Sequence, residues 1–535
     1  MKTLSSGFIT KMKEYPFPQS PDTRKDKIPR QQLLAEHATL SFLCCSIYNK
    51  LYNRLLKIEH SLGDGYFCTD SEGADISTID KNMAENLEKE IRTALESETE
   101  FQNVRISRSE LEAFFEARGF YDKLGLLKTF PGEQIPCLRY GDYIDYIVEP
   151  MSTDKARLAI FNIISYESGI VLRFPSILDP TALNQNWNDP SALFNIFHEN
   201  KKWAKLIGCD SVFKLNELIY NRRVDGLKWV AEGLHEQKLA KIAKHLVKNF
   251  PKNDSQGKRI ITIAGPSSSN KTTFALRLAI QLRVNGHTST VISMDDYYKD
   301  RDDIPYGEDG LQDFESITAL NIEVLSQNVK KMLKGEKVPE RKFDFVSGKG
   351  YNDENHKIEL SPSSFLIIEG IHGLNPELLT SLGRDKVTPI YISALTPLNL
   401  DFNHRFPTSD LRLIRRIIRD YKYRGYSPRK TLQRWTSVRL GEERNIFPFQ
   451  GNAELFFNSA LVYELPVLSI MGKALLAEAT IPEPEEDPDS PETREVTNEA
   501  RRILNLLNFF YPITAEVVPH VSCIREFIGG SDLKY

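Results

Sequence analysis

The chain has 535 residues, with 69 lysines and arginines against 73 aspartates and glutamates, which gives a formal net charge of −4. This length requires several domains, each large enough to bury a core without disulfides. The balanced charge disfavours a protein that binds nucleic acid through phosphate attraction over its whole surface. Six cysteines without a C-x-x-C pair indicate neither a disulfide framework nor a zinc ribbon, so we expect a reducing, cytoplasmic location.

Changes in composition divide the first half of the chain. Residues 1–32 are basic and then rich in proline, which predicts a disordered tail. A helical apolar pattern over Leu33–Leu55, followed by mixed short strands and helices, predicts an α+β domain over residues 33–215. Apolar residues at helical spacing predict a helical connector over 216–257. No apolar stretch approaches the roughly 20 residues that span a bilayer, so no membrane partner is expected.

Short apolar runs alternate with helical segments in the second half. This alternation predicts an α/β domain over residues 258–480, a parallel sheet with helices on both faces. An acidic, proline-rich linker is expected over 481–498, and residues 499–535 are expected to pack on the α/β domain. The strands are expected at Arg259–Ala264, Thr290–Met294, Ser364–Ile368 and Pro389–Ser393, with a helix at Thr272–Val284.

A phosphate-binding loop follows the first of these strands. Such a loop turns backbone N–H groups and a helix N-terminus toward phosphate oxygens, and supplies a lysine to the phosphates and a hydroxyl to Mg²⁺. Lys271 and Thr272 fit those two roles. The expected nucleotide-binding residues are Gly265, Ser267, Ser268, Ser269, Asn270, Lys271, Thr272 and Thr273.

Asn270 stands where the usual pattern has glycine. Asparagine is among the few other residues that tolerate a positive φ, so the turn is expected to survive. On this interpretation Asn270→Gly preserves or raises turnover. A degenerate loop that no longer transfers phosphate is the alternative.

Carboxylates follow two of the strands, at the sheet edge where open α/β folds bind ligands. Asp295 and Asp296 end the second strand, and one of them is a candidate base for an attacking hydroxyl, while a turn or helix cap explains the other. Glu369 ends the third strand and is, with Thr272, the candidate Mg²⁺ ligand.

The most informative helix is predicted at Leu411–Tyr421. Arg412, Arg415, Arg416 and Arg419 fall in a stripe about 100° wide. Because a guanidinium fork binds phosphate oxygens in pairs, we expect at least two of these arginines to clamp transferring phosphates, with Arg415 and Arg419 as catalytic candidates. A solvated basic face and a nucleic-acid contact are the alternatives.

Together these segments resemble the uridine kinase and phosphoribulokinase group of P-loop kinases. The resemblance is carried by the Gly265 loop, the Asp295 segment, Phe343-Asp-Phe-Val-Ser347, Ile-Glu369-Gly-Ile and the Arg412 helix. It implies ATP and Mg²⁺ as cofactors, Asp295 as general base for a ribose 5′-hydroxyl, and uridine or cytidine as acceptor. It further makes Tyr298 a substrate contact, Asp313 or Glu315 a partner of the ribose hydroxyls, and the Arg412 helix the root of a lid that closes on ATP. Phe343 and Arg412 are also expected on the substrate side.

The acceptor base stays open, because the motif departs from the uridine kinase pattern. There the segment begins with tyrosine and continues to a histidine that helps to hold the pyrimidine, whereas here Phe343 and Gly348 occupy those places. Weak discrimination among nucleosides is expected. The alternatives are a kinase for another nucleoside or a sugar phosphate, and an RNA-interacting or regulatory protein with weak turnover. The expected partner is a small molecule, nucleic acid is not expected, and a homo-oligomer stays open.

The N-terminal half carries a second resemblance, to the editing-type domain of threonyl-tRNA synthetase. It rests on Glu36-His37-Ala-Thr-Leu-Ser-Phe-Leu and on the segment from His60 to Cys68. Some longer nucleoside kinases are fused to a region of this kind, and the segments Trp435–Leu468 and Arg525–Ser531 resemble those kinases. Ser41 stands where the synthetase has the second histidine of a pair on one helix face. We therefore expect no zinc site and no deacylation of tRNA, but packing against the kinase or subunit contacts.

Overall fold

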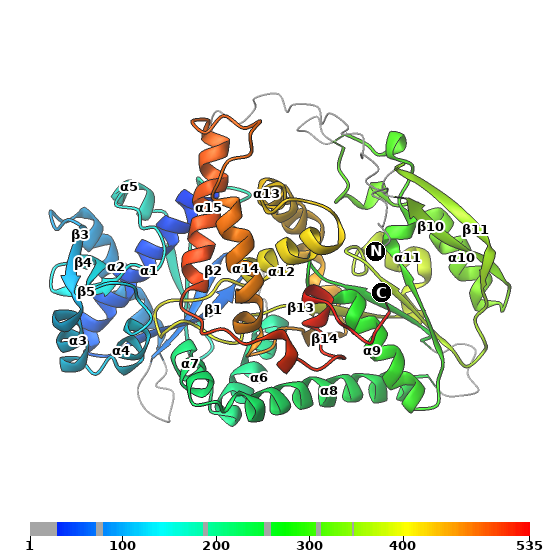
Figure 1. Cartoon of the computed structure of the whole chain (residues 1–535), viewed down its shortest axis with the longest axis horizontal. Coiled ribbons are helices and arrows are strands. Elements are labelled where there is room, and N and C mark those ends of the chain that lie inside the picture. Colours follow the sequence, from blue (N-terminus) through cyan, green and yellow to red (C-terminus); the bar gives the residue numbers. More distant parts are fainter. Residues whose placement is uncertain are drawn as a thin grey trace, which may run out of the picture.

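A computed structural model describes residues 29–70, 79–185, 191–250, 258–306, 312–344 and 347–534 (Figure 1). The tail predicted over 1–32 lies outside these residues up to residue 28, and helix α1 begins at Arg30. Among the described residues, no helix has the length and apolar character needed to cross a membrane.

The N-terminal body is α+β, as predicted. The predicted first helix is confirmed as α1, which ends where Asn53 adopts a left-handed conformation with φ 52°. An antiparallel sheet of order β1-β2-β7-β6 and a smaller one of order β3-β4-β5 complete the body. The elements are α1 (Arg30–Tyr52), β1 (Leu56–Leu62), β2 (Gly65–Asp70), α2 (Lys81–Glu96), β3 (Gln102–Ser107), α3 (Arg108–Ala117), α4 (Tyr121–Leu127), β4 (Gln134–Tyr140), β5 (Tyr143–Tyr146), α5 (Lys155–Leu158), β6 (Asn162–Tyr166) and β7 (Gly169–Arg173).

Three helices connect the two halves. They are α6 (Ser191–Ile207), α7 (Val212–Tyr220) and α8 (Val224–Lys248). In Figure 1, α8 runs along the lower edge of the molecule from the N-terminal side to the α/β side. Its apolar residues Leu239, Ile242 and Leu246 are buried against the parallel sheet, which explains the helical spacing seen in the sequence.

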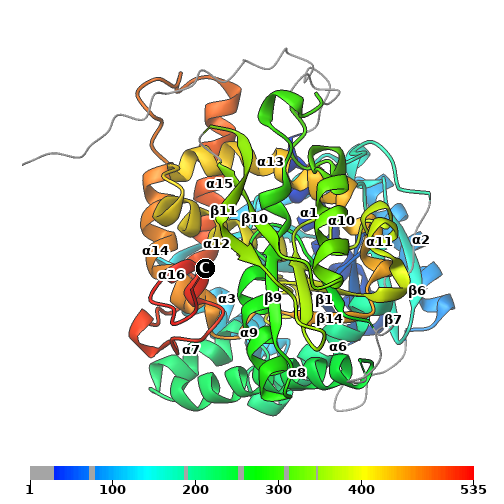
Figure 2. The same cartoon turned by 90° about the vertical axis from the view of Figure 1, so that its right-hand side faces the viewer.

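The second half is an α/β unit with five parallel strands in the order β14-β13-β8-β12-β9. Helices α8 and α9 lie on one face of this sheet and helices α10 and α11 on the other (Figure 2). Their apolar side chains are buried against the strands, which confirms the predicted fold class. Strand β14 was not predicted, because four residues give too short a pattern. The elements are β8 (Ile260–Ala264), α9 (Lys271–Val284), β9 (Ser289–Ser293), α10 (Ile322–Leu333), β12 (Phe365–Glu369), α11 (Pro376–Leu382), β13 (Val387–Ser393) and β14 (Leu455–Asn458).

A two-stranded hairpin, the α-helices α12 to α16 and several short 3-10 helices complete the described part of the chain. The hairpin is formed by β10 (Val338–Asp344) and β11 (Lys349–Ile358), and the helices are α12 (Thr408–Tyr423), α13 (Pro428–Asn445), α14 (Glu464–Ala479), α15 (Pro491–Leu507) and α16 (Arg525–Ile528). The prediction of a linker over 481–498 is wrong for residues 491–498, which belong to helix α15. Helix α15 begins at Pro491, because the Ser490 side chain caps it by accepting from the Thr493 N–H.

The largest hydrophobic core is shared by both ends of the chain. It runs from α1 and the N-terminal sheet through α12, α14 and α15 to Phe527. Figure 1 shows α14 and α15 standing between the blue N-terminal elements and the green α/β elements. Because residues so distant in sequence fill one core, the N-terminal body and the C-terminal helices stabilise each other.

Candidate active site

The phosphate loop joins β8 to α9 at the carboxyl edge of the parallel sheet. A Cβ at Gly265 would lie 2.2 Å from the Ile392 carbonyl oxygen, so only glycine fits there. Ser268 and Asn270 both have positive φ, 59° and 66°, which confirms that asparagine supports the left-handed turn. Lys271 folds back over the loop, with Nζ donating to the Gly265 oxygen at 3.0 Å and the Pro266 oxygen at 3.2 Å.

Thr272 and Glu369 meet beside this loop. Thr272 Oγ1 donates to Glu369 Oε1 at 3.1 Å, and Ser293 Oγ donates to the same oxygen at 3.3 Å. Glu369 is next to Ser293 in the strand register. Burial, with a smaller contribution from Asp295, raises the pKa of Glu369 to about 7 against the opposing effect of Lys271.

These residues fit a bound Mg²⁺. The raised pKa of the buried Glu369 carboxylate indicates that its negative charge is poorly compensated in the folded protein. A cation bound beside Thr272 would compensate that charge. No cluster of three or more His, Cys, Asp or Glu side chains suited to a metal occurs in the described part of the chain. Mg²⁺ needs only one or two carboxylates when phosphate oxygens and water complete its shell, so one carboxylate and one hydroxyl suffice.

The two neighbouring aspartates have different environments. Asp295 is exposed at the end of β9, and its charge acts on Lys271. Asp296 is half-buried, and its Oδ1 accepts from the Phe343 N–H of the hairpin at 3.3 Å. Asp295 is therefore the carboxylate open to a substrate, whereas Asp296 supports the hairpin.

Asp313 and Glu315 both act on Tyr298 together with Asp295, and Glu315 also interacts with Lys271. Burial and then Glu442 raise the pKa of Glu315 to about 7, with further effects from Asp295 and Lys271. Asp313 Oδ1 accepts from the Glu315 N–H at 3.1 Å and so holds the turn.

Gly441 is a site residue that was not predicted. A Cβ at Gly441 would lie 2.6 Å from Glu315 Cγ, so this position in α13 has to be glycine for Glu315 to reach the site. The available signal was a glycine inside a helical pattern, which costs helix stability and often marks a close approach.

Two of the four arginines on α12 lie beneath the loop in buried ion pairs. Arg415 is fully buried, pairs with Glu464 at 2.5 and 2.7 Å, and donates from Nη1 to the Ser268 oxygen at 3.0 Å. Arg412 forks onto Glu442 and reaches the Ser267 oxygen at 3.3 Å. The solvated-face interpretation is wrong for this pair. The structure gives Arg415 a supporting position in place of the predicted clamp, because Glu464 already occupies its fork.

Arg416 and Arg419 lie near Ser267 and Lys271 of the loop. Arg416 Nη1 donates to Ser267 Oγ at 2.7 Å, and the charge of Arg419 acts on Lys271. Burial, followed by the charge of Arg424, lowers the pKa of Arg419 to about 10. The Nε atoms of Arg416 and Arg419 are buried without a hydrogen-bond partner in the described structure, although Asp420 lies 3.3 and 3.6 Å away. The Asp420 carboxylate is therefore the ion-pair partner of both guanidinium groups.

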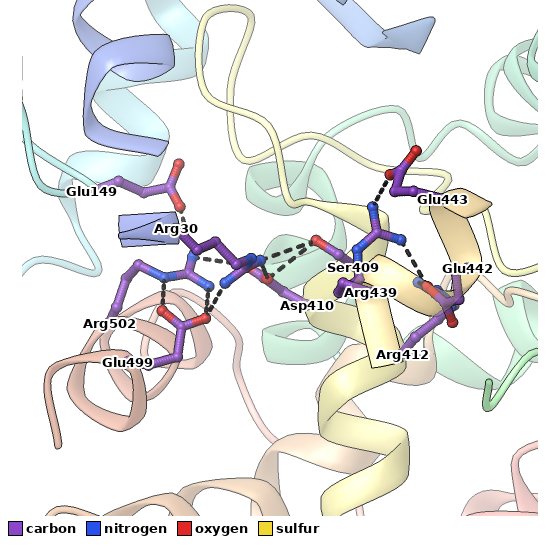
Figure 3. Close-up of polar contacts among 10 residues, drawn as sticks. All are labelled: Arg30, Glu149, Ser409, Asp410, Arg412, Arg439, Glu442, Glu443, Glu499 and Arg502. Atoms are coloured by element: carbon purple, nitrogen blue, oxygen red, sulfur yellow. Dashed lines mark hydrogen bonds and ion pairs between the residues drawn. The ribbon is translucent and has the colours of Figure 1, made fainter. Parts of the chain in front are cut away.

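Helix α12 also connects the loop to both ends of the chain (Figure 3). Near its start, Asp410 accepts from Arg30 of α1 at 3.2 Å and from Arg502 of α15 at 2.7 Å. Two residues further on, Arg412 reaches Glu442, whose carboxylate also accepts from the Ser267 N–H at 2.9 Å. The two clusters in Figure 3 thus link α1 and α15 to α12, which reaches the phosphate loop through Arg412 and Glu442.

Aromatic residues lie along the predicted acceptor side. The rings of Tyr298 and Phe343 are 5.8 Å apart, and Tyr298 Oη donates to the Phe314 oxygen at 3.1 Å. Gly348 has φ +72°, and a Cβ there would lie 2.8 Å from Arg301 Cβ and 2.9 Å from its Nε. The Arg301 side chain therefore fills the space that a residue at 348 would enter, which the sequence did not indicate.

The N-terminal histidines are packed against aromatic rings. His37 stacks on Phe174 at 4.1 Å, and its Nε2 lies 3.1 Å from the Pro175 oxygen. His60 stacks on Phe197 at 3.6 Å. Burial lowers the pKa of His37 to about 4 and that of His60 to about 3, so both rings are neutral near pH 7. His60 is buried and His37 is half-buried, and the expected lack of zinc stays a prediction.

Comparisons with known proteins converge on the second half of the chain. A family model described as "Phosphoribulokinase / Uridine kinase family" matches residues 260–463, a region that begins at β8 and contains the phosphate loop. A uridine kinase from Anoxybacillus flavithermus is 28% identical over 179 residues, which cover 34% of this chain and 75% of that protein. A uridine kinase from Staphylococcus haemolyticus is also 28% identical over 179 residues, covering 34% of this chain and 76% of that protein. The solved D-glycerate 3-kinase of Cryptococcus neoformans var. grubii is 13% identical, covers 39% of this chain and 86% of its own, and has a TM-score of 0.27.

Proposed function

We propose that this protein is an ATP- and Mg²⁺-dependent kinase that phosphorylates the 5′-hydroxyl of a nucleoside. One observation carries the proposal: a phosphate-loop lysine, a hydroxyl–carboxylate pair and an exposed aspartate converge at one edge of a parallel sheet. The family match over residues 260–463 and the uridine kinase relatives support it.

In the proposed reaction each residue has a separate role. Lys271, released from the loop carbonyls, and Arg419 stabilise negative charge on the β- and γ-phosphates. Thr272 and Glu369 would hold the magnesium ion, whose charge neutralises phosphate oxygens. Asp295 accepts the proton of the acceptor hydroxyl as that oxygen bonds to the γ-phosphorus and the bond to the β–γ bridging oxygen breaks, which leaves ADP.

Uridine or cytidine is the proposed acceptor, by likeness to the uridine kinases. Tyr298 and Phe343 offer ring faces beside Asp295, and Glu315 is the proposed partner of the ribose hydroxyls. Since ring stacking distinguishes bases weakly, we expect several nucleosides to be used with kcat/KM values of similar order. A preference of about 10⁴-fold for one base, the level of hydrogen-bond readout, would contradict this expectation.

A phosphorylated acceptor is the second candidate, and Arg301 favours it. Its guanidinium group packs at Gly348 in the acceptor hairpin, where a cation suits an anionic substrate better than a neutral nucleoside. The third candidate, an RNA-contacting protein with weak turnover, loses support because Arg412 and Arg415 of the basic stripe are buried in ion pairs.

A substrate panel tests these proposals. The full-length protein is incubated with Mg·ATP and a panel of nucleosides and sugar phosphates, and products are identified by mass. Lys271→Ala serves as the inactive control because it removes the phosphate-binding charge. A product 80 mass units heavier, about the mass of one transferred phosphoryl group, from a nucleoside supports the first candidate. A product from a sugar phosphate alone supports the second, and ATP binding without any product supports the third.

A further inference from the structure

The C-terminal segment reaches back to the phosphate loop. Asn270 is buried, and its Nδ2 donates to the Cys523 carbonyl oxygen at 2.9 Å and to Glu526 Oε2 at 3.0 Å. Its partners lie 253 and 256 residues further along the chain. Glycine, the usual residue at this place, has no side chain to make either bond.

The Glu526 carboxylate contacts the loop in two ways. Besides the bond from Asn270, the same oxygen accepts from Thr273 Oγ1 in the first turn of α9. Its charge also acts on Lys271 and Arg419, which surround the place of the nucleotide phosphates. Glu526 is thus fixed at the base of the loop while it influences the two proposed phosphate-binding cations.

The segment that carries Glu526 is itself anchored. The Phe527 ring is buried, and the Arg415 guanidinium group lies 5.0 Å from its centre. Arg525 donates to the Val518 oxygen at 2.6 Å and to the Ala515 oxygen at 2.9 Å. Glu526 therefore keeps its place without the help of Asn270, and the loop residue is the partner that is held.

We infer that Asn270 and Glu526 form a matched pair and that Glu526 is a positioning residue of the nucleotide site. The Asn270 amide donates a hydrogen bond to the Glu526 carboxylate. Because this bond satisfies the carboxylate, Glu526 does not draw Lys271 away from the phosphates. The expectation that Asn270→Gly preserves turnover assumed a side chain without a role, and these two bonds give it one. The inference rests on the proposed function for its nucleotide readout.

The pair is tested by a double-mutant cycle in the full chain, with the Kd of Mg·ATP as the measured quantity. Glu526→Gln and Asn270→Gly are each expected to raise this Kd about tenfold, the effect of one bond to a charged group. The double variant is expected to lose no more than either single variant. Acceptor KM and the unfolding midpoint should stay within error for Glu526→Gln, a pattern that a general loss of structure would not give. Glu516→Gln, on the same segment but away from the loop, is the matched control.

A second measurement needs no nucleotide. Hydrogen exchange of the loop peptide covering 265–274 is followed in the free protein, where Glu526→Gln should speed exchange several-fold and Glu516→Gln should not. If the unmodified protein binds no Mg·ATP, the proposed function fails and this measurement alone decides the pair. Unchanged loop exchange in Glu526→Gln, or independent and additive effects of the two substitutions on Kd, would overturn the inference.

Discussion

At the scale of single residues, adjacent side chains of the same type differ in their contacts and therefore in their expected roles. Asp295 is exposed beside Lys271, whereas Asp296 is occupied by the Phe343 N–H. We expect Asp295→Asn to lower kcat by about 10²- to 10⁴-fold, because positioned proton transfer contributes that much. The Kd of Mg·ATP should be nearly unchanged, since the residue acts on the acceptor. Steady-state kinetics with the accepted substrate and a nucleotide titration measure the two quantities.

Asp296→Asn is the matched control for that prediction. It removes the same charge one position away and keeps an oxygen that accepts from Phe343, so we expect a kcat within about tenfold of the unmodified enzyme, less than one positioned catalytic group contributes. If Asp295→Asn retains normal turnover, or if the two variants behave alike, Asp295 is not the base.

Glu369 gives a prediction for pH dependence. Its folded pKa of about 7 exceeds its ordinary value of 4.5, so the folded state binds more protons between those pH values. Stability is therefore fully present below about 4.5 and declines as pH rises through about 7. Lys271, Asp295 and Glu526 are the charged groups that act on it. Without Mg²⁺, Glu369→Gln should stabilise the protein at pH 8 by on the order of 1–3 kcal/mol and have little effect at pH 4.5.

Urea denaturation in EDTA at the two pH values measures this difference. Added Mg²⁺ should raise the stability of the unmodified protein at pH 8 more than that of Glu369→Gln, because the carboxylate is the proposed metal ligand. A variant that is less stable than the unmodified protein at pH 8 would show that Glu369 is ionised and well paired in the folded state.

At the scale of elements, α12 carries both a supporting arginine and an arginine with a proposed role in catalysis. Arg415 holds the Ser268 carbonyl from a fully buried ion pair, whereas Arg419 lies beside Lys271. Arg415→Ala should destabilise the protein by about 3–5 kcal/mol, because it leaves Glu464 buried without a partner. Arg419→Ala should instead lower kcat with a much smaller loss of stability. Denaturation curves and kinetics on both variants separate the roles, and equal destabilisation by the two would contradict them.

At the scale of the whole molecule, a buried charge cluster joins the N-terminal body to the α/β half. Lys123 Nζ contacts Asp145 at 2.7 Å and Asp401 at 3.4 Å, and His404 Nδ1 lies 2.8 Å from Asp401. Burial alone would lower the pKa of Lys123, but Asp145, Asp401 and Asp122 outweigh it and raise the pKa. Asp401 belongs to the loop before α12, and α12 contacts the phosphate loop. The cluster therefore connects the N-terminal body to the segment that leads into this helix.

Lys123→Met tests the strength of that junction. It removes the cation that pairs with both buried carboxylates and leaves them only His404, so we expect a loss of about 3–5 kcal/mol in the free energy of unfolding. Lys81→Met is the control, because Lys81 pairs with Glu85 at 3.6 Å on the surface and should cost less than about 1 kcal/mol. Equal stability of the two variants would show that the halves do not depend on this cluster.

The sequence alone determined the features that lie within a few consecutive residues. The phosphate loop from Gly265 to Thr273, the strands that flank it and the carboxylates that end them follow from local spacing, because a loop and its two elements are contiguous. The register then brings Glu369 beside Ser293, as expected for neighbouring parallel strands. Helical periodicity likewise placed the four arginines of α12 on one stripe.

Only the tertiary structure decided how those side chains are used. Periodicity gives the face of a helix but not its partner, and the partners Glu442 and Glu464 lie 30 and 49 residues after Arg412 and Arg415. Asn270 seemed a tolerated replacement for glycine because its partner Glu526 is 256 residues away. Pairings of this kind depend on how the whole chain packs into one core, and packing over such separations leaves no periodic trace in the sequence.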